Sequence, residues 1–108
     1  MKKLDEIKKI VTKCFEDREI KIKSIFLFGS RARSDFKPES DWDVLIVLDK
    51  DLTPPEKREI WSRVSEVLHK RFPYFSFDII IKSMESFEKE KTVVNTISNE
   101  AYLEGMEI

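Results

Sequence analysis

Two short apolar segments enclose a polar stretch that carries small and acidic residues at both of its ends. Residues 24–28 and 44–48 are almost continuously apolar, which is typical of buried strands. Gly29-Ser30 follows the first segment directly, and Asp41 and Asp43 lie just before the second. Because alternate residues of a strand point to the same side, the two carboxylates should project together. The sequence therefore predicts two strands whose ends gather a glycine–serine turn and a pair of acids.

The rest of the chain alternates helical and strand-like patterns. Thr53-Pro54-Pro55-Glu56 has the composition of a helix start, with a capping threonine, prolines in the first turn and the glutamate of a capping box. Gly105 is a candidate C-terminal cap for the last helix. The predicted elements are a helix over residues 2–18, strands over 24–28 and 43–48 with a short helix or turn within 31–40 between them, a helix over 53–71, a strand over 74–82, and a helical segment over 84–104 that breaks near 91–92.

This order of elements predicts the fold class. Helices and strands are mixed along the chain, and no linker, repeat or low-complexity tract interrupts them. A chain of 108 residues is long enough for one core and too short for two. We therefore expect a single α+β domain over residues 1–108, with a small mixed β-sheet and helices packed mainly on one face.

Composition and charge exclude several classes of protein. The chain has 20 Lys and Arg against 21 Asp and Glu, a net charge of −1, whereas a protein that grips a nucleic-acid backbone usually carries a basic stripe. The single cysteine, Cys14, excludes an intrachain disulfide and a cysteine metal cluster. No apolar run reaches membrane-spanning length. We expect a cytoplasmic protein that binds no membrane and does not work mainly on nucleic acid.

Asp78 interrupts the apolar third strand and is the candidate third carboxylate. If that strand lies beside the second, the acids at positions 41, 43 and 78 converge. Two such charges about 4 Å apart repel by roughly 4 kcal/mol at an effective dielectric near 20. The carboxylates must then take up protons or bind a divalent cation. Oxygen ligands without nearby histidine or cysteine favour Mg²⁺ or Mn²⁺ over Zn²⁺.

The glycine–serine pair is suited to binding phosphate. Gly29 has no side chain, so a phosphate can approach its backbone closely. Ser30 can donate its hydroxyl at the start of the following segment, where backbone N–H groups favour an anion. Arg31 and Arg33 are able to neutralise a triphosphate further. With two cations about 3.5–4 Å apart, such a site would support in-line displacement at the α-phosphate, with pyrophosphate as the leaving group.

At these residues the chain resembles the nucleotidyltransferases of the DNA polymerase β superfamily, and above all the minimal nucleotidyltransferase group, which is similar to the N-terminal domain of kanamycin nucleotidyltransferase. The signature of that group is Gly-Ser, ten residues, Asp-x-Asp and a distal acid on a later strand. This chain supplies Gly29-Ser30, ten residues, Asp41 and Asp43, and then Asp78. It has Ser34 where the group commonly has glycine.

The resemblance implies a reaction and a set of ligands. The donor is ATP, two Mg²⁺ ions bind, and AMP is transferred to a hydroxyl acceptor. Asp41 and Asp43 then correspond to ligands of both metals, and Asp78 corresponds to a ligand of the catalytic metal that promotes the nucleophile. Gly29 and Ser30 correspond to phosphate binders.

The resemblance also implies a partner. Small members of this group often act with a separately encoded helical protein of the HEPN class as toxin–antitoxin modules, and some of them adenylylate the toxin. A domain of this size has no second domain to hold an acceptor, so we expect an acceptor or a partner subunit supplied in trans; a homo-oligomer is also compatible with the sequence. One alternative is a non-catalytic, nucleotide-binding antitoxin that neutralises its partner by direct contact. A transferase acting on small molecules is disfavoured, because nothing encloses such a substrate.

Other residues have simpler explanations. Asp49 and Asp51 rival Asp78 as the third acid, but they follow the second strand in a predicted loop. His69 is expected to be exposed, and Cys14 to be buried as a small apolar residue. Trp42 should point away from the two acids and pack against a helix. The aromatic residues near the third strand and on the preceding helix are predicted to be mostly core: Trp61, Phe72, Tyr74, Phe75 and Phe77.

Overall fold

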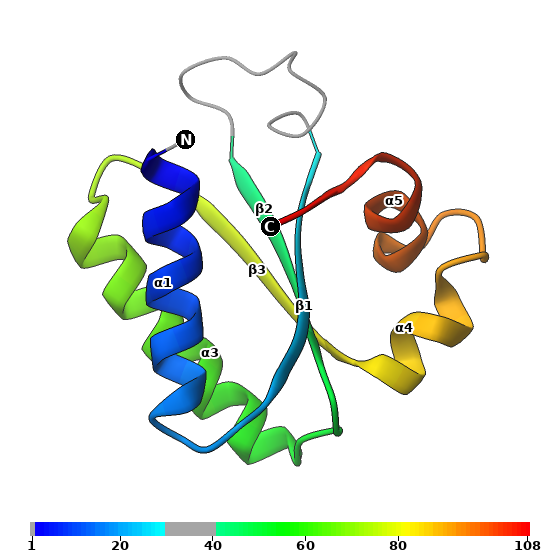
Figure 1. The fold of residues 1–108 in the computed structure, drawn as a ribbon, viewed down its shortest axis with the longest axis horizontal. Helices are drawn as coiled ribbons and strands as arrows, with labels where there is room; N and C mark the ends of the chain where they lie inside the picture. The colour runs from blue at the N-terminus through cyan, green and yellow to red at the C-terminus, as the bar shows by residue number, and fades with distance from the viewer. Residues whose placement is uncertain (1, 30–40) are drawn as a thin grey trace.

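The computed structural model describes residues 2–29 and 41–108. Four strands form a single sheet that lies between two pairs of helices (Figure 1). The elements in chain order are α1 (Lys2–Glu16), β1 (Ile22–Phe28), β2 (Trp42–Leu48), α3 (Pro54–Arg71), β3 (Phe77–Ser83), α4 (Met84–Glu90), α5 (Ile97–Glu104) and β4 (Met106–Glu107). The short helix or turn predicted within residues 31–40 lies outside the described residues.

The sheet is mixed, as predicted. Its strand order is β3-β2-β1-β4. β1 runs antiparallel to both β2 and β4, and β2 runs parallel to β3. The parallel pair needs a crossover connection, and α3 supplies it. β2 therefore lies inside the sheet with a helical layer over each face, which explains why its apolar run is continuous rather than alternating.

The two faces of the sheet carry two separate hydrophobic clusters. The long helices α1 and α3 pack on the face that contains Val44, Ile46 and Leu48. The short helices α4 and α5 pack on the opposite face, where Leu45 and Val47 point (Figure 1). Most of the helical residues thus cover one face, as expected. The smaller second layer leaves part of the other face for a site.

Capping explains where the helices begin and end. The Thr53 hydroxyl accepts from the Glu56 N–H at 3.3 Å, and the Glu56 carboxylate accepts from the Thr53 N–H at 2.9 Å. This is the predicted capping box. Gly105 follows α5, and a Cβ at that position would lie 2.2 Å from the carbonyl oxygen of Ala101. Gly105 is therefore the C-terminal cap of α5, as predicted. Glycine is required at this position because the backbone of Ala101 lies too close to admit a side chain.

Most predictions of burial are confirmed, and two are wrong. Cys14 is buried, and Trp42 is buried on the α1–α3 face, where its ring stacks on Phe75 with centroids 5.8 Å apart. Tyr74 is 97% exposed because it lies in the turn between α3 and β3, and Trp61 is 46% exposed because it covers the edge of β3. The Trp61 indole N–H donates to the carbonyl of Ile79 at 3.0 Å.

Charged and polar residues outside the strands also lie where they were predicted. Asp49, Asp51 and His69 are exposed. No helix in the described part of the chain combines the length and the apolar character that a membrane crossing requires.

Candidate functional site

The register of β2 and β3 places two of the predicted acids side by side. Asp43 pairs with Asp78 in the parallel ladder, and neighbouring strands lie about 4.8 Å apart. Asp43 alternates with Val44, which points toward α1 and α3, so both carboxylates belong to the α4–α5 face. Asp78 is exposed and Asp43 is half-buried. The prediction that the third strand lies beside the second is confirmed.

Gly29 closes the other side of this site. Phe28 pairs with Asp43 in the antiparallel ladder, so the chain turns at Gly29 directly beside the Asp43 carboxylate. The φ of Gly29 is +74°, in the left-handed region that favours glycine. A Cβ at this position would lie 2.1 Å from Oδ2 of Asp43. Glycine is therefore required twice here, by the backbone conformation and by the close approach of the carboxylate.

Asp41 lies just before β2 and is exposed. The backbone N–H of Trp42 donates to the carbonyl of Ser76 at 2.8 Å, which fixes the start of β2 against the chain that leads into β3. Within residues 2–29 and 41–108, no three acidic, histidine or cysteine side chains are gathered closely enough to form a metal site. The structure thus brings Asp43 and Asp78 together by register, and the convergence of all three acids stays a prediction.

The acids that are paired by register suit a hard divalent cation. Both donors are carboxylate oxygens, and the one cysteine and one histidine of the chain lie on α1 and α3, in the helical layer over the opposite face of the sheet. Two unit charges about 5 Å apart repel by about 1 to 3 kcal/mol between the dielectric of water and that of a protein surface. A cation would remove this repulsion. Ser30, Arg31 and Arg33, the other predicted phosphate ligands, lie outside the described residues.

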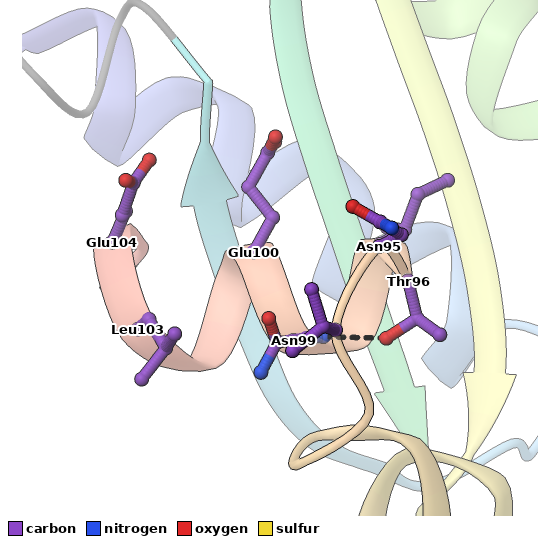
Figure 2. A pocket seen from close by; sticks show the side chains of 8 residues that line it. Asn95, Thr96, Asn99, Glu100, Leu103 and Glu104 are labelled. Atoms are coloured by element: carbon purple, nitrogen blue, oxygen red, sulfur yellow. Dashed lines mark hydrogen bonds between the residues drawn. The ribbon is translucent and has the colours of Figure 1, made fainter.

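Sequence reasoning missed two acidic residues near this end of the sheet. β4 pairs Met106 with Leu27 and Glu107 with Phe26, which returns the chain to the end of β1 after α5. Figure 2 shows Glu100 and Glu104 extending from α5 in the direction in which β1 runs, toward its Gly29 end. The sequence offered no signal for this placement, because β4 is only two residues long and has no periodicity.

Known proteins resemble this chain in sequence. A family model described as "Polymerase beta, Nucleotidyltransferase" matches residues 6–101. The Methanocaldococcus jannaschii protein named "Putative protein adenylyltransferase MJ0141" is 31% identical over 105 residues, which cover 97% of this chain and 94% of that protein.

Solved structures also resemble this fold. A toxin–antitoxin crystallised with AMP-PNP superposes with a TM-score of 0.59 at 16% identity, over 92% of this chain and 69% of that one. A crystal structure described as a "putative nucleotidyltransferase" superposes with a TM-score of 0.52 at 26% identity, over 89% of this chain and 95% of that one. The family match spans the glycine turn and all three acids, and the chain belongs to the polymerase beta nucleotidyltransferase family.

Proposed function

We propose that this nucleotidyltransferase transfers AMP from ATP to a hydroxyl group of a partner protein. The observation that carries the proposal is the register that sets Asp43 beside Asp78 and Phe28 beside Asp43, with Gly29 left-handed at the same end of the sheet. This arrangement offers acids and an open backbone to a nucleoside triphosphate. The relative named as a protein adenylyltransferase and the toxin–antitoxin structure with AMP-PNP support AMP transfer to a protein.

The chemistry assigns different roles to the two neighbouring acids. The acceptor oxygen forms a bond to the α-phosphorus, the bond from that phosphorus to the α–β bridging oxygen breaks, and pyrophosphate leaves. Asp78 is more exposed than Asp43, and this supports assigning to Asp78 the role of taking the hydroxyl proton of an incoming acceptor and passing it to water. Asp43 is half-buried against Gly29, and we assign it to the side of the site where the triphosphate of the donor binds.

The remaining predicted residues complete this site. Two Mg²⁺ ions, or Mn²⁺ in their place, held by Asp41, Asp43 and Asp78 would neutralise the triphosphate and polarise the reacting oxygens. Gly29 leaves its backbone open to a phosphate. Ser30, Arg31 and Arg33 are proposed to bind the phosphates from the segment outside the described residues.

The proposed acceptor is a separate helical protein, a toxin of the HEPN class, and the present chain is its antitoxin. The toxin–antitoxin structure that shares this fold supports the assignment. The alternative is a non-catalytic antitoxin that binds nucleotide and neutralises its partner by contact. The two differ in one respect: only the enzyme needs an intact acid pair to relieve toxicity.

The test compares wild type with Asp43→Asn, using ATP labelled at the α-phosphate, Mg²⁺ and a lysate of the host. Asp49→Asn is the matched control, because Asp49 is an exposed aspartate at the opposite end of β2. We expect Asp43→Asn to lower labelling by about 100-fold or more, since it removes a ligand of the cations that would neutralise the reacting phosphate. Asp49→Asn should leave labelling unchanged.

Two results would contradict the proposed function. Equal labelling by wild type and Asp43→Asn would remove the enzymatic role of the acid pair. Relief of toxicity by Asp43→Asn in the absence of ATP would instead establish the alternative of neutralisation by contact.

A further inference from the structure

A groove with exposed apolar side chains lies along α5, on the same side of the sheet as the acid pair. Val94 is 73% exposed, Leu103 is 69% exposed and Ile97 is 38% exposed. They line a groove of about 380 Å³ together with Asn99, Glu100 and Glu104 (Figure 2). Apolar side chains gathered at one exposed site indicate a binding surface more often than singly scattered ones do.

Hydrogen bonds hold the connection between α4 and α5 in a defined conformation. The Thr96 hydroxyl lies 3.0 Å from the carbonyl oxygen of Glu90 and 2.9 Å from that of Val93. The Asn99 amide donates to the carbonyl of Lys91 at 2.7 Å. Asn95 has a φ of +71°, a conformation that asparagine tolerates better than most residues. These contacts therefore hold the loop that presents the exposed Val94 in one conformation.

A second set of contacts ties the start of α5 to the sheet. The Ser98 hydroxyl, which is buried, donates to the Glu90 carboxylate at 3.0 Å. Lys82 on β3 pairs with the same carboxylate oxygen at 2.9 Å. β3, α4 and α5 are thus joined through Glu90. Such preorganisation lowers the conformational entropy that a partner must offset on binding.

The helix that carries the groove packs on the same face of the sheet as the acid pair. α5 packs on the sheet through Ala101, which belongs to the same cluster as Phe28 and Leu45. Phe28 immediately precedes Gly29, and Leu45 lies two residues after Asp43 on the same face. Glu100 extends from the groove toward that end (Figure 2). A chain lying in the groove would therefore meet an acidic side chain on the side that faces the Gly29 end of β1.

We propose that the α5 groove, lined by Val94, Ile97 and Leu103 and bordered by Glu100, binds a segment of the acceptor protein in which apolar residues are flanked by lysine or arginine. The proposal rests on the proposed function, because it names the acceptor surface of the same site. The apolar residues fit the groove, and the carboxylate at its border selects cations and repels acidic segments.

The experiment uses two dye-labelled synthetic peptides with the full chain. One alternates leucine and lysine around a single tyrosine, and the other has glutamate in place of every lysine. Binding is measured by fluorescence anisotropy for wild type, Glu100→Lys and Leu103→Ser. Glu16→Lys is the matched control, since Glu16 is an exposed glutamate at the end of α1, on the opposite layer, and gives the same change in net charge. Transfer of labelled AMP to the same peptides is measured in parallel.

We expect wild type to bind the lysine peptide on the order of tenfold more tightly than the glutamate peptide. Glu100→Lys should reverse this preference, Leu103→Ser should weaken binding of both peptides, and Glu16→Lys should change neither. Because Glu100 and Leu103 are exposed, circular dichroism should show both variants folded.

The outcomes separate this inference from the proposed function. AMP transfer to both peptides at equal rates, unaltered by Glu100→Lys, would overturn the inference and leave the function standing. Charge-selective binding, together with a failure of wild type to label any protein of the host lysate, would support the groove and remove the function. An equal effect of Glu100→Lys and Glu16→Lys on binding would show that the net charge of the protein alone determines which peptide it binds. That result would also overturn the inference.

Discussion

Replacing Gly29 by alanine should destabilise the fold through two terms that can be separated. The first is the backbone, because an L-residue in the left-handed region at a φ of +74° is disfavoured by about 1–2 kcal/mol. The second is steric, because the new Cβ would lie 2.1 Å from Oδ2 of Asp43. The carboxylate must rotate away, and an off-rotamer side chain costs about 1 kcal/mol. We expect Gly29→Ala to lower the free energy of unfolding by about 2–3 kcal/mol.

A double-mutant cycle with Asp43→Ala isolates the steric term. Once the carboxylate is removed, the nearest atom of residue 43 to the new methyl is its Cβ at 3.5 Å, an ordinary contact. Gly29→Ala should therefore cost about 1–2 kcal/mol in the Asp43→Ala background and about 1 kcal/mol more when Asp43 is present. Urea unfolding followed by tryptophan fluorescence gives all four free energies of unfolding.

On the proposed function, Gly29→Ala should also lower AMP transfer at urea concentrations where the variant is still folded, because it displaces the carboxylate of Asp43. Gly105→Ala is the control. Gly105 has a φ of −77°, and the three atoms nearest to its added Cβ would all belong to the backbone of Ala101, so this variant should lose stability without altering Asp43. An identical cost of Gly29→Ala in both backgrounds, or full activity of the folded variant, would refute the reasoning.

Three further predictions concern the acids and the core. Asp78→Asn removes the like charge beside Asp43, so Mg²⁺ at about ten times its Kd should stabilise wild type by about 1.4 kcal/mol and the variant by less, as measured by thermal unfolding with and without MgCl₂. The ion pair with Lys82 and the hydrogen bond from Ser98 lower the pKa of Glu90 below its ordinary value of 4.5. The stabilising contribution of Glu90 is therefore complete above pH 4.5 and is lost as pH falls through the lower pKa of the folded state. Amide exchange in α5 should rise as pH falls through that lower pKa, and Glu90→Gln should remove this pH dependence. Burial raises the pKa of the Cys14 thiol. A thiol reagent at mildly alkaline pH should therefore react slowly with the native chain and rapidly with the chain unfolded in urea. Fast reaction of the native chain would contradict the burial of Cys14.

The sequence predicted the parts of the fold that depend on local pattern. The capping box at Thr53 and Glu56, the break between α4 and α5, and the inward direction of Trp42 all follow from spacing and side-chain chemistry, and the structure confirms them. The closeness of Asp43 and Asp78 could also be predicted, because a single acid within an otherwise apolar strand indicated a functional carboxylate.

Features set by long-range contacts could not be predicted in the same way. β4 has only two residues, and its pairing with β1 depends on where α5 ends and in which direction the chain continues from it. Tyr74 and Trp61 were expected to be mostly core because aromatic residues usually are, yet a turn and a strand edge leave them exposed. Glu100 was predicted only as part of a helical segment, because the direction in which its side chain extends, toward the Gly29 end of β1, depends on how α5 docks on the sheet.

The packing of Ala101 has a consequence for how this domain could diversify. Its methyl group is fully buried between α5 and the sheet, so the size of the side chain at this position acts as a spacer for the helix. A valine or leucine there would lift α5 outward and widen the distance between Glu100 and the strand ends while every charge stayed the same. Relatives could thus bind a different range of acceptors through a change in the volume of this one apolar side chain, with no change to the reacting residues.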